Sequence, residues 1–206
     1  RPNKETILLD SYLQRNKKSI VANLKDAVTV EKLKSLVKEY DIIIEQFRPG
    51  VMERLGLGYE ALKEINPSII YCSITGYGQT GPYRNRAGHD INYVALSGIP
   101  SHSGSKNSGP PNLGVQIADI AGGSLHAAVA ILAAVNNRHV TGEGQHLDIS
   151  MTDCAFTLNA VAAATYFKDG TVPTPESSLL NGGSFYGYYE TADGRFLSIG
   201  SLEPAF

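Results

Sequence analysis

Three glycines follow an apolar, β-branched segment with the spacing that dinucleotide-binding loops use. The segment 68–74 (SIIYCSI) precedes Gly76, Gly78 and Gly81, which spell G-x-G-x-x-G. In a dinucleotide site the third glycine opens a helix, whose N-terminus holds a pyrophosphate through free N–H groups. Residues 82–88 (PYRNRAG) lack helical periodicity, and no acidic strand end follows about 20 residues on. We therefore expect a glycine-rich turn at the end of a strand, with NAD-dependent redox chemistry only as an alternative.

Other candidate nucleophiles and metal ligands lack the spacing of a recognisable site. The histidines outside position 89 are not spaced as ligands with one another or with Cys72 and Cys154. No G-x-S-x-G motif supports a serine hydrolase. His89 could bind backbone groups in a loop, and Asp119 could be the N-cap of the helical pattern that follows it. Residue types alone therefore predict no metal site and leave the roles of His89 and Asp119 open.

Hydrophobic periodicity predicts strands that alternate with helices. Expected strands cover 19–24, 41–47, 68–74 and 144–151, and expected helices cover 29–40 (with Thr29 as N-cap), 59–65, 119–135 and 153–168. The third helix consists of small apolar residues, so we expect it to be buried. Segment 97–116 is rich in Gly, Ser and Pro and is expected to be a loop, and 192–194 to be the turn of a hairpin. This alternation predicts an α/β fold with a parallel sheet.

The composition argues against several broad classes of function. The 206 residues include 18 Lys and Arg and 20 Asp and Glu, so the formal charge of −2 offers no basic field for nucleic acid or an anionic membrane. No apolar run reaches the roughly 18 residues that a membrane-spanning helix needs. Two cysteines far apart in sequence favour a reducing compartment. Without an initiator Met or a signal-peptide pattern, we expect both ends to be internal to a longer protein.

Several short sequence words occur in a fixed order around the glycine turn. They are 47–58 (FRPGVMERLGLG), 87–93 (AGHDINY), 118–123 (ADIAGG) and 202–204 (LEP). In this order and spacing they resemble the family III CoA-transferases (CaiB/BaiF), and within that family they are most similar to the α-methylacyl-CoA racemases. The resemblance covers nearly the whole chain.

This resemblance implies a fold and an assembly. Family members have a large Rossmann-like domain with a parallel sheet and a smaller α+β domain, and two chains interlock as linked rings. By resemblance, residues 1–170 belong to the large domain, whose start is missing, and 171–206 begin the small domain, whose remainder is missing. The expected partner is a second copy in an interlocked homodimer. The expected location is the cytoplasm, with mitochondria or peroxisomes as alternatives.

The resemblance also implies a catalytic group. Racemising the carbon next to a thioester requires a proton to leave one face and another to arrive at the opposite face. His89 and Asp119 resemble the two acid–base residues of the racemases, and Glu203 resembles a glutamate that lies near the histidine. Asp90, next to His89, is expected to line the same site. No cofactor is implied, because coenzyme A is part of the acyl-CoA substrate.

Coenzyme A requires cations for its phosphates and an apolar contact for its adenine ring. In the family, matching residues contact CoA, and arginine forks suit phosphate oxygens. The matching positions in this sequence are Lys25, Phe47, Arg48 and Arg54. Gly122 and Gly123 would let the substrate approach the backbone closely.

The leading hypothesis is therefore a cofactor-independent racemase of 2-methylacyl-CoA thioesters that uses two bases and an enolate. The alternative within the family is a CoA-transferase, in which the carboxylate of Asp119 forms a covalent acyl intermediate. A third hypothesis is a non-catalytic module that binds acyl-CoA. The expected ligand in each case is an acyl-CoA thioester, with no nucleic acid and no membrane as partner.

Overall fold

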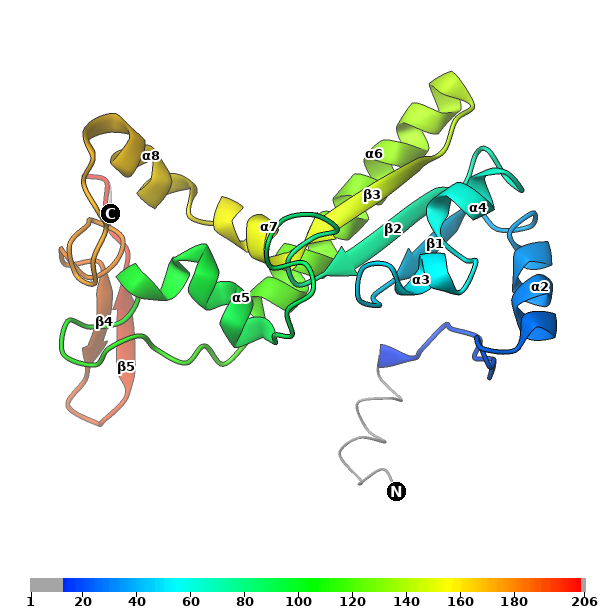
Figure 1. Ribbon diagram of the computed structural model, residues 1–206. Coiled ribbons are helices and arrows are strands. Elements are labelled where there is room, and N and C mark those ends of the chain that lie inside the picture. Colours follow the sequence, from blue (N-terminus) through cyan, green and yellow to red (C-terminus); the bar gives the residue numbers. More distant parts are fainter. Residues whose placement is uncertain (1–12, 205–206) are drawn as a thin grey trace.

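The computed structural model describes residues 13–204, and its centre is a three-stranded parallel sheet (Figure 1). The strands are β1 (Ile42–Glu45), β2 (Ile70–Thr75) and β3 (Gln145–Ser150), in the order β1-β2-β3. Ile70 of β2 lies opposite Ile42 on one side and Gln145 on the other. Parallel pairing places the carboxyl ends of the three strands at one edge of the sheet. Three of the four predicted strands are thus confirmed.

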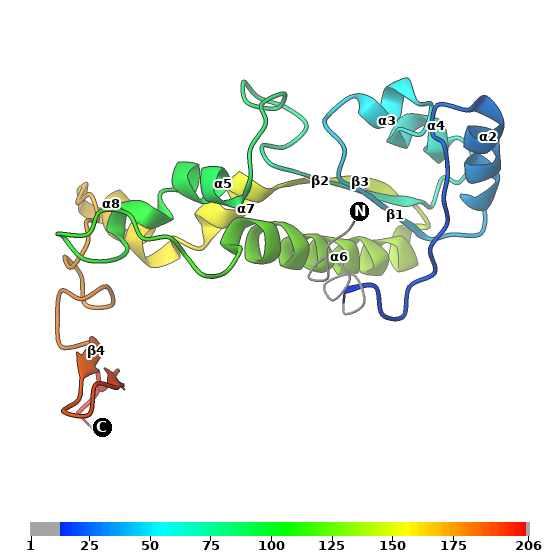
Figure 2. The ribbon, with the colours of Figure 1, turned by 90° about the horizontal axis from the view of Figure 1, so that it is seen from below.

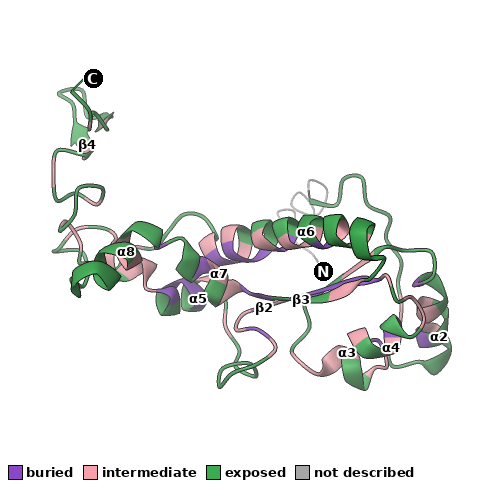
Figure 3. Cartoon of the chain, turned by 90° about the horizontal axis from the view of Figure 1, so that it is seen from above, coloured by how far each residue is buried: buried purple, intermediate pink, exposed green. Residues whose placement is uncertain are grey.

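Helices cover both faces of this sheet (Figures 2 and 3). One face carries α3 (Val51–Arg54) and α4 (Tyr59–Lys63), with α2 (Ala27–Leu36) beside them, and the other carries α6 (His126–Thr141). Because successive strand residues point to opposite faces, Tyr71 packs with residues of α2 and α4 while Ile70 and Cys72 pack with α6. The parallel α/β architecture that the sequence predicts is therefore present.

The segment before α2 differs from the prediction. Residues 19–24 form no strand, and Ile20 and Val21 are 70% and 104% exposed. A strand requires a neighbour for its backbone N–H and C=O groups, and these residues pair with none in the part of the chain that is described. Helix α2 begins two residues earlier than expected, because its N-cap is Asp26, whose Oδ2 accepts from Thr29 N at 2.9 Å.

The predicted helix 119–135 begins earlier and ends later than expected. Its first part is a π-helix, η2 (Ile117–Leu125), which continues directly into α6. Helix α6 ends before Gly142, whose φ of 76° is the left-handed conformation of a glycine cap. Arg138 lies in the last turn and pairs with Asp41 at 3.0 Å, so this turn is tied to the start of β1.

The same helix is more exposed than its small apolar residues suggested. Ala127 and Ala134 are buried against the sheet, whereas Val129 and Leu132 are each 68% exposed. A narrow sheet covers only one stripe of the helix surface, so the prediction of a buried helix was wrong for the other side. The 25 residues Ile117–Thr141 are long and apolar enough, by length and composition alone, to cross a membrane, which differs from the expectation that no segment is. Core helices of soluble proteins pass the same test.

Short helices form a separate cluster beyond the carboxyl ends of the strands. They are α5 (Asp90–Ser97), the 3-10 helix η1 (Ile99–His102), α7 (Met151–Thr157) and α8 (Ala160–Asp169). Tyr93 and Val94 of α5 pack against Ala118 of η2 and Ala155 of α7. The sequence analysis did not predict α5 or η1, because α5 has only eight residues and η1 lies in the Gly- and Ser-rich segment.

The predicted helix 153–168 is divided into α7 and α8. Asn159 lies buried between the two helices. Its Nδ2 donates to Ser97 O at 2.8 Å, and its Oδ1 lies 2.8 Å from His102 Nε2. These bonds satisfy a buried amide at the point where the helix breaks. Local periodicity does not contain this information, because both partners are more than 50 residues away in sequence.

The last strands form the predicted hairpin. β4 (Gly187–Glu190) and β5 (Phe196–Ile199) pair antiparallel, with Gly187 opposite Ile199. Figures 1 and 2 show the hairpin beyond α8, away from the three-stranded sheet. The expected domain boundary between residues 170 and 171 stays a prediction.

We expect Gly144→Ala to destabilise the fold. Gly144 precedes β3, and a Cβ there would overlap the backbone oxygen of Ile69 beside β2. Only a backbone movement relieves this overlap, at a cost of about 1–3 kcal/mol in the free energy of unfolding. Chemical denaturation measures the loss. Gly114→Ala is the matched control, because a Cβ there meets no atom within 4 Å, and equal stabilities of the two variants would contradict the prediction.

Candidate active site

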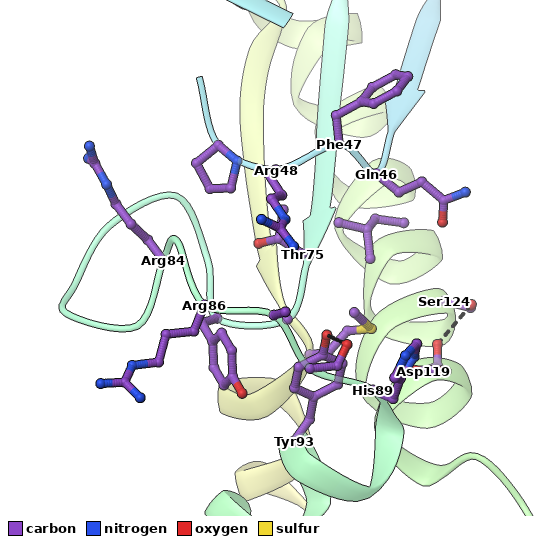
Figure 4. Close-up of a pocket in the computed structure, with 17 residues that line it drawn as sticks. Gln46, Phe47, Arg48, Thr75, Arg84, Arg86, His89, Tyr93, Asp119 and Ser124 are labelled. Carbon is purple, nitrogen blue, oxygen red and sulfur yellow. Dashed lines mark hydrogen bonds between the residues drawn. The ribbon is translucent and has the colours of Figure 1, made fainter. Parts of the chain in front are cut away.

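A cavity of about 530 Å³ opens at the carboxyl ends of β1 and β2 (Figure 4). Its walls come from residues 46–49 after β1, residues 74–77 at the end of β2, and Arg84 and residues 86–89 before α5. Asp119 and Ser124 of η2 also line it. Ligands of α/β folds commonly bind at this edge of the sheet, which makes the cavity the candidate active site.

The glycine turn borders this cavity but is built differently from a dinucleotide loop. Residues 82–85 form a turn, so no helix opens at Gly81, as expected. Gln79 N donates to both carboxylate oxygens of Asp148, at 3.1 and 2.9 Å. A backbone N–H that a pyrophosphate would need is therefore bonded to a carboxylate of the chain itself. Gly78 and Gly81 have φ values of 79° and 81°, which only glycine adopts readily.

His89 is the N-cap of α5. Its backbone is extended (φ −130°, ψ 175°), and its N–H donates to Asn92 Oδ1 at 3.0 Å. This bond is one half of a capping box and fixes the backbone of His89 at the helix end. The imidazole borders the cavity beside Asp119 (Figure 4).

Asp119 is the third residue of η2 and is partly buried at the cavity. It is not the N-cap that the sequence suggested; that position belongs to Gln116. Asp119 N donates to Asp90 Oδ1 at 2.9 Å, so the carboxylate of Asp90 satisfies an N–H of the first helical turn. Burial and then the charge of Asp90 raise the pKa of Asp119, while His89 lowers it. The histidine and the aspartate therefore interact electrostatically.

Asp90 and the two glycines of η2 lie outside the cavity wall. Asp90 contacts the backbone of Asp119 instead. A Cβ at Gly122 would lie 2.8 Å from Met151 O, and one at Gly123 would lie 3.0 Å from Met151 Cγ. The missing side chains of both glycines thus make room for α7, and their predicted contact with substrate stays a prediction.

The predicted CoA-binding residues fall into two groups. Phe47 and Arg48 line the cavity, whereas Lys25 and Arg54 are exposed outside it. Two further lining residues, Arg84 and Arg86, were not assigned from the sequence. The residues that line the cavity thus include three arginines, whose guanidinium groups suit phosphate oxygens. In Figure 4 the side chains of Arg84 and Arg86 extend outward, away from His89 and Asp119.

Glu203 does not line the cavity of its own chain. It is exposed and lies in the segment after β5. The hairpin that precedes it lies beyond α8 (Figure 1). One chain therefore does not bring Glu203 to His89.

Thr75 is a cavity residue that the sequence analysis missed. It is 8% exposed, and its Oγ1 has no hydrogen-bond partner among the described residues, although it lines the cavity. Such a hydroxyl is available to a ligand, because an unpartnered buried donor is costly. The sequence does contain a signal that could have identified Thr75. Tyr71, Ser73 and Thr75 are alternate residues of β2, so their side chains lie on one face of the strand. Within residues 13–204, no three His, Cys, Asp or Glu side chains are grouped as metal ligands.

We expect Asp119→Asn to change stability in a pH-dependent way. Because the folded-state pKa of Asp119 lies above 3.8, folding favours the neutral carboxyl. The cost of ionising it is absent at low pH and is present once the pH exceeds the folded-state pKa. Asparagine removes this cost, so the variant should gain stability over the wild type at about pH 7, and the gain should shrink towards about pH 4. Urea unfolding at both pH values measures it.

The control for this experiment is Asp169→Asn. Hydrogen bonds from the side chain and backbone of Thr171 lower the pKa of Asp169, so its removal should reduce stability at neutral pH. That loss should fade as the pH falls through the folded-state pKa of Asp169. A gain for Asp119→Asn that is the same at both pH values would contradict the assignment.

Comparisons with known proteins agree with this architecture. Residues 3–206 match the sequence profile of CoA-transferase family III. The chain is 41% identical over 200 residues to the alpha-methylacyl-CoA racemase of Homo sapiens, covering 95% of this chain and 52% of that protein. It is 42% identical over 154 residues to the succinyl-CoA:glutarate CoA-transferase of Homo sapiens, covering 75% of this chain and 35% of that protein.

A solved structure shows the same fold. The CAIB/BAIF family protein from Brucella suis matches with a TM-score of 0.78 and 38% identity, covering 87% of this chain and 47% of that chain. The chain thus spans about half the length of the racemase and of the solved structure. Racemases and transferases both occur among the relatives, so similarity identifies the family but not the reaction. The chain belongs to CoA-transferase family III.

Proposed function

We propose that the full-length protein epimerises 2-methylacyl-CoA thioesters by moving the α-proton between His89 and Asp119. This proposal rests on the observation that both residues line one cavity. His89 lies at the start of α5, and Asp119 lies on η2. Acid–base groups on two separate elements can exchange protons with opposite faces of one carbon. The 41% identity to the human racemase supports this choice of reaction.

The raised pKa of Asp119 supports its proposed role as a proton donor. Burial and the charge of Asp90 favour the neutral carboxyl of Asp119, which is the form that delivers a proton. Neutral His89 removes the α-proton of one epimer, and Asp119 protonates the enolate from the other side. The products are imidazolium and carboxylate, which is the pair that starts the reverse reaction. Each turnover therefore exchanges the protonation states of the two residues.

The arginines of the cavity wall are proposed to bind the phosphates of coenzyme A. Arg48, Arg84 and Arg86 supply planar, charged donors, and the ring of Phe47 is 43% exposed for contact with the adenine. The thioester then extends towards His89 and Asp119. No cofactor beyond the substrate takes part in this proposal.

We also propose that a second copy of the chain completes the site. Glu203 lies outside the cavity of its own chain, and an interlocked homodimer could bring it to the histidine of the other copy. A carboxylate beside His89 would orient the imidazole and stabilise its charged form.

A CoA-transferase is the second candidate, and the 42% identity to the human succinyl-CoA:glutarate CoA-transferase favours it. In that reaction the carboxylate of Asp119 attacks the thioester carbonyl and releases the CoA thiolate, which leaves an acyl-aspartyl anhydride. The thiolate then attacks the aspartyl carbonyl and releases the acid. His89 has no required role in these steps, so its place beside Asp119 favours racemisation.

We expect His89→Asn and Asp119→Asn each to slow racemisation by about 10²- to 10⁴-fold, because each removes one acid–base group. The assay incubates the full-length protein with one pure epimer of a 2-methylacyl-CoA in deuterium oxide, without an acceptor acid. NMR then measures deuterium at the α-carbon and the appearance of the other epimer. The exposed His139, on α6, provides the control variant His139→Asn.

Two results of this assay would reject the proposal. One is racemisation by Asp119→Asn at the wild-type rate. The other is an absence of exchange in the wild type, with CoA transfer only when a carboxylic acid is added, which would establish the transferase instead.

We expect Arg48→Gln to raise the KM for acyl-CoA by about tenfold with a smaller change in kcat, because a charged hydrogen bond to a phosphate contributes about 1.5–3 kcal/mol. Steady-state kinetics measure both constants. Arg195→Gln is the control, because Arg195 is exposed on the hairpin and pairs with Asp193 at 3.2 Å. Equal KM values for the Arg48 variant and the wild type would contradict the phosphate assignment.

A further inference from the structure

Tyr93 connects the end of β2 to His89. It lies in the first turn of α5 and is only 7% exposed, yet it borders the cavity. Its hydroxyl donates to Gly88 O at 2.5 Å, the carbonyl directly before His89. Its ring lies edge-to-face on Tyr77, with centroids 5.2 Å apart. The sequence analysis gave Tyr93 no role.

Two glycines make room for this ring. A Cβ at Gly76 would overlap the Tyr93 ring, and one at Gly88 would lie 2.6 Å from Tyr93 Cε1. Gly76 is also fixed in place, because its carbonyl accepts from Thr152 Oγ1 at 2.7 Å and from Thr152 N at 3.1 Å. The first glycine of the G-x-G-x-x-G sequence is thus explained by an aromatic side chain rather than by a phosphate.

We infer that Tyr93 is a positioning residue, which holds the imidazole of His89 beside Asp119 at the cavity. This inference rests on the proposed acid–base function of His89. Two hydrogen bonds hold the peptide group that joins Gly88 to His89: Tyr93 Oη donates to its carbonyl oxygen, and its N–H donates to Asn92 Oδ1. Both partners lie on the first turn of α5, so His89 and the helix end move together.

The protonation of Tyr93 is consistent with this function. Burial, followed by Tyr77 and Asp119, raises the pKa of its phenol, with Arg48 acting in the opposite direction. The hydroxyl therefore stays a hydrogen-bond donor at neutral pH. A displacement of about 1 Å at a catalytic group can cost about 100-fold in rate, so one lost bond beside His89 should be measurable.

The test uses the full-length protein and measures proton exchange separately on each face of the substrate α-carbon. Each pure epimer of a 2-methylacyl-CoA is incubated in deuterium oxide, and deuterium is measured in the recovered starting epimer, which reports the base on that face. His89→Asn identifies the epimer that uses His89. Tyr93→Phe keeps the ring and removes the hydroxyl; it should slow exchange of that epimer by about 10- to 100-fold. Exchange of the other epimer, and the KM, should stay close to wild type.

A second variant and a control accompany this test. Asn92 is exposed, and Asn92→Ala removes the other hydrogen bond, so it should cause the same one-sided loss without disturbing the packing of the ring. Tyr166→Phe makes the same chemical change on α8, away from the cavity, and should leave both exchange rates unchanged. Equal losses on both faces, or no loss on either, would assign Tyr93 a merely structural role and overturn the inference.

A spectroscopic measurement distinguishes this inference from the proposed function. If the wild type exchanges neither epimer, the racemase proposal fails, and the position of His89 is then read from its imidazole Hε1 signal, assigned with His89→Asn. Tyr93→Phe and Asn92→Ala should both shift or broaden this signal, whereas Tyr166→Phe should not. An unshifted signal in the first two variants would overturn the positioning function.

Discussion

The pairing of β2 with a parallel strand on each side is the constraint on which the rest of the structure depends. Residues 70–73 of β2 pair with both β1 and β3, so the segments that follow these strands must leave the sheet at one edge. Arg48 and Gly76 meet there although they are distant in sequence. On the rear face Cys72 is fully buried against α6, and burial raises the pKa of its thiol to about 11, so this sulfur is a packing group rather than a nucleophile.

The central sheet could be predicted because β1 and β2 are short apolar runs rich in isoleucine and β3 alternates apolar with polar residues, patterns that need no knowledge of neighbours. The break at Asn159 and the cap at Asp26 could not be placed in this way. The first depends on partners more than 50 residues away. The second depends on Asp26, whose side chain accepts the N–H bond of Thr29, the residue that was predicted as the N-cap. Segment 19–24, which was wrongly predicted as a strand, shows that a local apolar pattern is not sufficient. An apolar run forms a strand only where another strand lies beside it to pair with its backbone.

The residues of the candidate site fall into the same two classes: those that the sequence predicts and those that depend on contacts between distant segments. His89, Asp119 and Arg48 were predicted from sequence words, and the structure brings them to one cavity. Tyr93 and Thr75 were missed, because their positions follow from a hydrogen bond to a loop carbonyl and from strand alternation. Glu203 belongs to neither group. Its sequence motif is present, but Glu203 does not line the cavity of its own chain, and its catalytic role stays a prediction.

The π-helical winding of η2 has a consequence for how the acid group and the core are related. Each residue of an α-helix turns the chain by about 100°, and a π-segment holds one more residue per turn than an α-helix does. Loss of a single residue from η2 would therefore rewind it and swing Asp119 around the helix axis, while Ala127 and Ala134 of α6 kept their places on the sheet. The direction in which the carboxyl group points is thus set by segment length together with the packing of Ala118, Gly122 and Gly123 against neighbouring helices. A one-residue insertion or deletion could therefore redirect this group while α6 kept its contact with the sheet, but η2 would have to repack against α5 and α7.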